Sequence, residues 1–170
     1  MLVLISPEST LVPWADRALK WANQFPFQLH WRKKGPCTED EKKVLNAGLS
    51  HFKDRWVWHG NEEDAKQLGF SRYHASKSPY SQSVHNWEEW KSFPSCEYRL
   101  CSPVFDSISK QGYTANSGMQ QIPDWVKAKP ELKIALGGIT PSNAKMALSM
   151  GYDGIAVLGA VWELKSEYEQ

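Results

Sequence analysis

The sequence predicts an α/β fold in the form of a compact (β/α)8 (TIM) barrel with some shortened or missing helices. Short strand-like runs alternate with segments of helical periodicity, there are roughly eight such runs, and the last two lead directly into glycine turns. The 170 residues leave roughly 21 for each strand–helix unit. Such barrels usually need about 200 residues or more, so the helices must be trimmed, and an open doubly wound parallel sheet is the alternative.

Each expected strand is a short run of apolar residues or of alternating apolar and polar residues. In chain order these runs are Leu2–Ser6, Phe27–Arg32, Arg55–His59, Phe70–His74, Ser81–His85, Glu97–Cys101, Lys133–Leu136 and Gly154–Leu158. The helices expected between and after them cover Trp14–Gln24, Thr38–Phe52, Asn61–Leu68, Asn86–Phe93, Ile122–Ala128, Pro141–Met150 and Ala160–Glu167. No helix fits between the fourth and fifth strands, because Lys77–Tyr80 is too short.

The composition indicates a single soluble domain covering residues 1–170. The formal net charge of +1 gives no reason to expect a nucleic acid or a membrane as a partner. The apolar start, Leu2–Ile5, is too short for a signal peptide. Cys37, Cys96 and Cys101 are odd in number and lack metal-ligand spacing, which favours a reducing cytoplasm.

The two glycine turns near the C-terminus predict an anion-binding site. Gly137 and Gly138 follow the seventh expected strand, and Thr140 is the expected N-cap of the next helix. A second turn after the eighth strand opens the last helix. Bare backbone N–H groups at such turns suit a phosphate, and the predicted phosphate-binding residues are Gly137, Gly138, Leu158, Gly159 and Ala160.

The second expected strand carries a polar face that ends in positive charge. Side chains alternate along a strand, so Gln28, His30, Arg32 and Lys34 share one face, and Leu29 shares the other with Trp31. Arg32 and Lys34 at a strand exit would bind anionic substrate oxygens. The alternative is a solvated basic turn without a ligand.

Four histidines lie on consecutive expected strands: His30, His59, His74 and His85. Four imidazoles brought together at one end of the barrel would suit zinc or iron as ligands. No HxH pair or acidic partner accompanies them, so we assign no metal ligand and expect no cofactor.

The fifth expected strand ends in a candidate acid/base. Ser83 and His85 share a face, and Asn86 with Glu89 resembles a capping box, which leaves His85 free for proton transfer. The alternative is a structural histidine that is hydrogen-bonded to neighbouring residues at the end of the barrel.

A long loop, roughly residues 102–121, follows the sixth strand and is predicted to be a lid. In this lid, Ser107, Ser109 and Lys110 would contact a phosphate or diphosphate.

Taken together, these stretches resemble the superfamily of thiamine-phosphate synthases and thiazole tautomerases (TenI-like), whose members are (β/α)8 barrels. The matching segments are LHWRKKG, SVHNWEE, SPVFDSISK and LGGITPSNAKMALSMGYDGIAVLGAVW, in that order along nearly the whole chain. The resemblance implies a small-molecule partner, a phosphorylated thiazole or thiamine phosphate, and allows for a homodimer.

The resemblance also implies roles for particular residues. Arg32 and Lys34 would bind diphosphate or carboxylate oxygens, and Lys110 would lie on the diphosphate with Ser107 and Ser109 beside it. Gly138 and the backbone of residues 158–160 would bind the thiazole phosphate. His85 matches the position of the family's catalytic histidine, and His30 would assist it.

The resemblance favours the tautomerase branch, which isomerises a thiazole carboxylate phosphate without a metal. The synthases hold Mg²⁺ with carboxylates after the third and fourth strands, where this chain has His59-Gly60-Asn61 and His74-Ala75-Ser76. Mg²⁺ is expected only if synthase activity is retained. The alternatives are a thiamine-phosphate synthase, a non-catalytic binder of thiazole or thiamine phosphate, and another phosphate-handling barrel such as a sugar-phosphate isomerase or a histidine-metal hydrolase.

Overall fold

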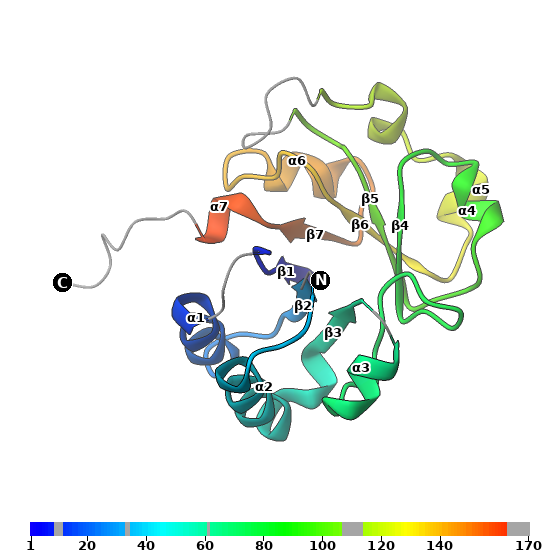
Figure 1. Cartoon of the computed structure of the whole chain (residues 1–170). Helices are drawn as coiled ribbons and strands as arrows, with labels where there is room; N and C mark the ends of the chain where they lie inside the picture. Colours follow the sequence, from blue (N-terminus) through cyan, green and yellow to red (C-terminus); the bar gives the residue numbers. More distant parts are fainter. Residues whose placement is uncertain (9–11, 33–34, 61, 107–113, 163–170) are drawn as a thin grey trace.

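A computed structural model describes residues 1–8, 12–32, 35–60, 62–106 and 114–162 of the chain. One parallel sheet of seven strands runs through it in the order β3-β2-β1-β7-β6-β5-β4 (Figure 1). The strands are β1 (Leu2–Ile5), β2 (Gln28–Arg32), β3 (Trp56–His59), β4 (Ser81–Val84), β5 (Tyr98–Cys101), β6 (Leu132–Ala135) and β7 (Gly154–Val157). The strand order is cyclic, because the first strand, β1, pairs with the last, β7. In a doubly wound sheet the strand order would instead reverse at a switch point.

The helices lie on the outer side of the curved sheet (Figure 1). They are α1 (Val12–Ala22), α2 (Glu39–Phe52), α3 (Glu62–Gln67), α4 (Glu89–Ser92), α5 (Asp124–Lys127), α6 (Ala144–Ser149) and α7 (Gly159–Trp162), with 3-10 turns η1 (Lys53–Arg55) and η2 (Ser117–Gln120). Within the residues that the structure describes, five of the seven have six residues or fewer, in agreement with the short units of the sequence. None of the helices in the described part of the chain combines the length and apolar character needed to cross a membrane.

The expected strand Phe70–His74 forms only two isolated parallel bridges, Trp58↔Tyr73 and His74↔Ser81. The N–H of His74 donates to the Trp58 carbonyl at 2.8 Å, and the N–H of Ala75 donates to the Ser81 carbonyl at 2.9 Å. Residues 72–75, called here the bridging segment, therefore link β3 to β4 without forming a full strand. Ala75, with a φ of 54°, ends the extended conformation directly after His74.

Alternation along the strands separates two hydrophobic cores. The outer core, between sheet and helices, contains Leu29 and Trp31 of β2, which are 2% and 0% exposed. The inner core contains Val3, Ile5, Tyr98, Leu100, Ile134 and Ala156. His30 pairs in register with Ile5, so the polar face predicted for the second strand points inward. Polar groups on that inner face therefore point into the interior that the curved sheet encloses.

The helix after β6 begins later than the sequence predicted. Thr140 is not its N-cap; α6 starts at Ala144 after a turn. The Asn143 side chain accepts the Thr140 N–H at 2.8 Å and donates to the Gly138 carbonyl at 2.8 Å. These two bonds hold residues 138–143 in a turn that delays the helix.

Helix α2, in contrast, has a complete capping box, which gives a first testable prediction. The Glu41 N–H donates to Thr38 Oγ1 at 3.2 Å, and the Thr38 N–H donates to Glu41 Oε2 at 2.7 Å. Thr38→Ala should lower the free energy of unfolding by about 1 kcal/mol, measured by urea denaturation. Thr140→Ala is the matched control, because the Thr140 hydroxyl hydrogen-bonds to Ser142 and does not cap α6. Equal losses in the two variants would contradict the capping role of Thr38.

Candidate functional site

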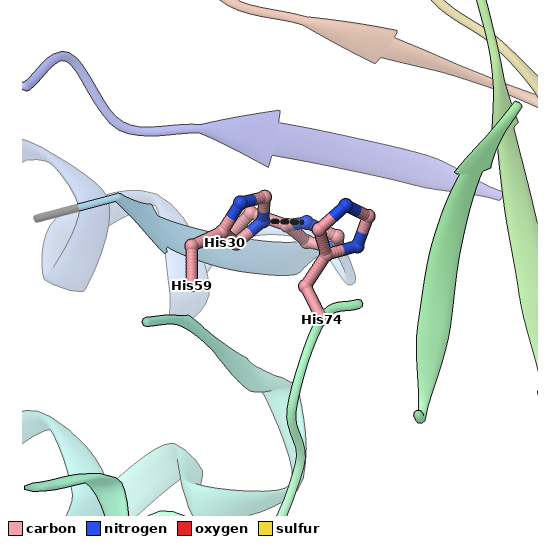
Figure 2. A group of neighbouring side chains, drawn as sticks. All are labelled: His30, His59 and His74. Carbon is pink, nitrogen blue, oxygen red and sulfur yellow. Dashed lines mark hydrogen bonds between the residues drawn. The ribbon is translucent and has the colours of Figure 1, made fainter. Parts of the chain in front are cut away.

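Three histidines from different parts of the chain meet on the inner face of the sheet. His30 lies in β2, His59 ends β3, and His74 belongs to the bridging segment (Figure 2). The Nδ1 of His30 is 2.6 Å from the Nε2 of His59, and the rings of His59 and His74 stack with centroids 4.1 Å apart. The centroids of His30 and His74 are 5.4 Å apart. Three of the four histidines singled out in the sequence thus converge.

Hydroxyl groups surround this histidine cluster. The Tyr98 hydroxyl is in hydrogen-bond contact with Nε2 of His30. The Oγ of Ser81 is 2.9 Å from Nδ1 of His74, and the Oγ of Ser83 is 3.0 Å from its Nε2. Ser83, a predicted substrate-binding residue, therefore lies beside the cluster.

Burial keeps the three imidazoles neutral at neutral pH. Burial, followed by the charge of His74, lowers the pKa of His30 well below its usual value. For His59, burial and then the neighbouring charges of His30, His74 and Arg32 lower the pKa in the same direction. Burial, followed by the charge of Arg32, lowers the pKa of His74 to about 4. Each neutral ring retains one nitrogen with a lone pair.

Arg32 lies at the carboxyl end of β2 with its side chain 31% exposed. Its guanidinium forms an ion pair with Glu8, a partner that the sequence did not indicate. The backbone N–H of Arg32 donates to Ser6 Oγ at 2.8 Å. A guanidinium held in this way keeps donors available for an anion. Lys34, predicted to act with it, lies outside the described residues.

His85 follows β4 and lies apart from the cluster. Its side chain is 54% exposed, and its Nδ1 is 3.4 Å from Oε2 of Glu89. The Glu89 carboxylate also accepts the His85 N–H at 2.7 Å, while Asn86 Oδ1 accepts the Glu89 N–H at 3.0 Å. The side-chain contacts between Asn86 and Glu89 are present, but Asn86 is not the helix N-cap as predicted, because α4 begins only at Glu89. The Glu89 carboxylate orients the histidine.

The two glycine turns follow neighbouring strands, since β6 pairs with β7. Gly137 and Gly138 have φ angles of 93° and 61°, and Gly159 opens α7. The Phe105 N–H donates to the Gly137 carbonyl at 3.1 Å, so the first turn also packs against the loop after β5. Leu158 and the backbone of Ala160 lie at the second turn. A phosphate role for these residues stays a prediction.

The predicted lid residues Ser107, Ser109 and Lys110 lie outside the described residues. The described ends of their loop are tied together, because the Ala115 N–H donates to Asp106 Oδ1 at 2.7 Å. Asn116 Nδ2 donates to the His85 carbonyl at 2.9 Å, which places the returning end of the loop beside the candidate acid/base.

Two side chains of the site were missed in the sequence. Tyr98 and Ser81 pair in register on β5 and β4, and both contact the histidine cluster. Alternation could have found Ser81, which shares a face with Ser83. Tyr98 looks like an ordinary core aromatic until the topology brings its strand opposite β2.

The chain matches a family model described as thiamine monophosphate synthase over residues 54–161. This match covers more than half of the chain, and the protein belongs to that family. Two relatives are the thiamine-phosphate synthases of Anoxybacillus flavithermus (36% identical over 92 residues, 52% of this chain and 42% of that protein) and Leptospira biflexa (38% over 77 residues, 45% and 36%). The matched regions cover less than half the length of these curated relatives.

Solved structures support a TIM-like α/β fold, in which the described residues form seven of the eight strands predicted for a full (β/α)8 barrel. Thiamine phosphate pyrophosphorylase from Bacteroides thetaiotaomicron superposes with a TM-score of 0.73 at 21% identity, covering 99% of this chain and 90% of that one. The enzyme of the same name from Pyrococcus furiosus gives a TM-score of 0.70 at 18% identity, covering 94% and 86%. At these identities the likeness shows the fold alone.

Proposed function

We propose that the protein isomerises a phosphorylated thiazole carboxylate by acid/base catalysis, as a thiazole tautomerase. The observation that carries the proposal is the pairing of His85 with Glu89 at the end of β4. Imidazole is the side chain suited to proton transfer near neutral pH, and a carboxylate partner fixes its orientation. The side chain is more than half exposed, so a substrate at the strand ends can reach it.

The reaction requires the transfer of protons only. A base removes a proton from a ring carbon, an acid delivers one to the exocyclic carbon, and the ring becomes aromatic without gain or loss of atoms. His85 would perform both transfers. His30 is fully buried, so its assistance would pass through His59, which its Nδ1 contacts.

The remaining predicted residues would bind the charged groups of the substrate. Arg32 would bind the carboxylate together with Lys34, and Ser83 would contact the same end of the substrate. The backbone of the two glycine turns would bind the phosphate, because adjacent parallel strands bring their carboxyl ends to one edge. The loop that carries Ser107, Ser109 and Lys110 would cover the substrate.

Mg²⁺ does not fit the side chains at the two strand ends where the family resemblance places its ligands. Among the described residues, these strands end in the imidazoles of His59 and His74, whereas Mg²⁺ takes oxygen ligands in octahedral geometry. We therefore derive no step through Mg²⁺. The second candidate function is thiamine-phosphate synthesis, which is favoured by the names of the relatives.

One assay tests both candidates. The purified chain is incubated with the exocyclic-alkene thiazole carboxylate phosphate, alone or with pyrimidine diphosphate and Mg²⁺, and the products are separated and identified. Isomerisation alone supports the proposal, whereas thiamine phosphate formed at an enzymatic rate overturns it in favour of the synthase. Tight binding without turnover of either substrate also overturns it and supports a non-catalytic binder.

A substitution tests the role of the imidazole. His85→Gln should lower kcat for isomerisation by roughly 10²–10⁴-fold, because the acid/base is lost while the phosphate contacts remain. Glu89→Gln keeps a side-chain oxygen that can accept the His85 N–H, so kcat should fall by less than in His85→Gln. His51→Gln, at an exposed histidine of α2, is the control. Unchanged turnover in His85→Gln would remove this residue from the mechanism.

A further inference from the structure

The histidine cluster has the composition and spacing of a metal site. An ion bound there would occupy Nδ1 of His30 and replace its contact with His59, so both proton transfers of the proposed isomerisation would be left to His85. His30, His59 and His74 each offer one ring nitrogen, and these three atoms all lie within 4.8 Å of one another. Figure 2 shows the rings gathered between β2, β3 and the bridging segment. His30 and His74 are 0% and 9% exposed, so the cluster is enclosed rather than spread over a surface.

We propose that His30, His59 and His74 bind one divalent transition metal ion, with Zn²⁺ as the best match. Imidazole is a preferred ligand for zinc and its neighbours in the first transition row. Two nitrogens at about 2.0–2.1 Å from a tetrahedral zinc ion lie roughly 3.4 Å apart. Small ring rotations, each moving a nitrogen by about 1 Å, bring the observed separations to that value.

The surrounding hydroxyl groups fit this arrangement. Zinc-bound histidines usually donate their second N–H to an oxygen, which fixes the ring and its tautomer. With Nδ1 of His30 on the metal, its Nε2–H donates to the Tyr98 hydroxyl; with Nε2 of His74 on the metal, its Nδ1–H donates to Ser81 Oγ at 2.9 Å. Two of the three ligands therefore already have the oxygen partner that a bound ion requires.

The protonation state supports the same assignment. Metal ions bind the neutral form of imidazole, and protons compete with them below the pKa of the ring. Burial lowers the pKa of each of the three histidines, so protons do not compete near neutral pH. Arg32 opposes a cation here, since its charge acts on His59 and His74, but its ion pair with Glu8 reduces that effect.

Three protein ligands leave the fourth tetrahedral position open. Sites of this kind hold a water molecule or a substrate atom, whereas structural zinc sites have four protein ligands. Ser83 Oγ, 3.0 Å from Nε2 of His74, lies next to the inferred ion. Arg32 near the same position would favour an anionic ligand.

Metal titration tests the proposal without any turnover assay. Untagged protein is stripped with EDTA, dialysed, and titrated with Zn²⁺ in competition with a chromophoric chelator, and separately with Co²⁺ while its visible d–d absorption is recorded. We expect one ion per chain and the strong absorption of four-coordinate Co²⁺. Binding no tighter than that of the His59→Asn variant, or a Co²⁺ spectrum like that of the hydrated ion, would overturn the proposal and leave a neutral hydrogen-bonded cluster.

Three variants make the result specific. His59→Asn replaces a partly exposed ligand. It should weaken Zn²⁺ binding by more than the roughly 10–100-fold that is typical when a ligand histidine loses its hydrogen-bond partner. Ser81→Ala removes only the hydrogen-bond partner of the His74 ring, so its loss of Zn²⁺ affinity should be within that roughly 10–100-fold range. His51→Gln should bind like the wild type. Circular dichroism of each variant checks the fold, and equal affinities for all four proteins would contradict the proposed ligands.

Discussion

Alanine at Gly138 is expected to lower the free energy of unfolding by roughly 2–5 kcal/mol. The φ of this residue is +61°, a left-handed conformation that costs an L side chain about 1–2 kcal/mol. A Cβ placed there would lie 2.1 Å from the carbonyl oxygen of Asp106 and 2.8 Å from the carbonyl carbon of Phe105. These are main-chain atoms, so the loop must move, at a further cost of about 1–3 kcal/mol.

Gly151→Ala is the matched control for this prediction. Gly151 also has a positive φ, +98°, but its Cβ would meet only Cδ1 of Ile122 at an ordinary 3.7 Å. Urea unfolding should therefore show a larger loss of unfolding free energy for Gly138→Ala than for Gly151→Ala. The difference should be about 1–3 kcal/mol, the cost of moving the loop, because both variants share the cost of a positive φ. Equal losses would mean that the loop after β5 moves aside freely.

This close approach changes how the first glycine turn is interpreted. Gly137 and Gly138 suggested a phosphate site because bare backbone suits an anion, and the structure supplies a second reason for glycine, the contact with residues 103–106. Both reasons can hold together. Displacing Asp106 would also disturb its bond to the Ala115 N–H, which ties the ends of the predicted lid loop. Loss of stability in Gly138→Ala therefore says nothing by itself about phosphate binding.

Local patterns in the sequence were sufficient to predict most of the fold. Alternation in β2 correctly put Leu29 and Trp31 in the outer core and His30 on the inner face, because a strand with one apolar face permits only one orientation. The short spacing between strands correctly predicted trimmed helices. The seven strands observed lie within the ranges predicted for them, except that β6 begins one residue earlier, at Leu132.

The remaining features depend on contacts between distant segments. Nothing local shows that residues 72–75 form only bridges, since that follows from the short connection to β4 and from the positive φ of Ala75. The sequence also placed four histidines at strand ends as equivalents. The strand positions and the Glu89 carboxylate separate them, bringing His30, His59 and His74 together while His85 contacts α4.

Acidification should destabilise the metal-free protein through the same buried histidines. Unfolding returns His74 from a pKa of about 4 to the ordinary value of 6.5, so the unfolded chain binds more protons between these two values. The stabilisation is therefore fully present above pH 6.5 and is lost as the pH falls toward 4. From His74 alone the free energy of unfolding should drop by about 2 kcal/mol between pH 7 and pH 5.

A comparison of variants isolates this contribution from the titration of the carboxylates. In EDTA, His74→Gln should be less stable than the wild type at pH 7, because the contacts with Ser81 and Ser83 change, but the difference should shrink by about 2 kcal/mol at pH 5, since glutamine does not titrate. His51→Gln, at an exposed histidine, should follow the wild-type curve. Chemical denaturation at each pH gives the free energies. A His74→Gln difference that stays constant with pH would show that this imidazole is protonated as easily in the folded protein as in the unfolded chain.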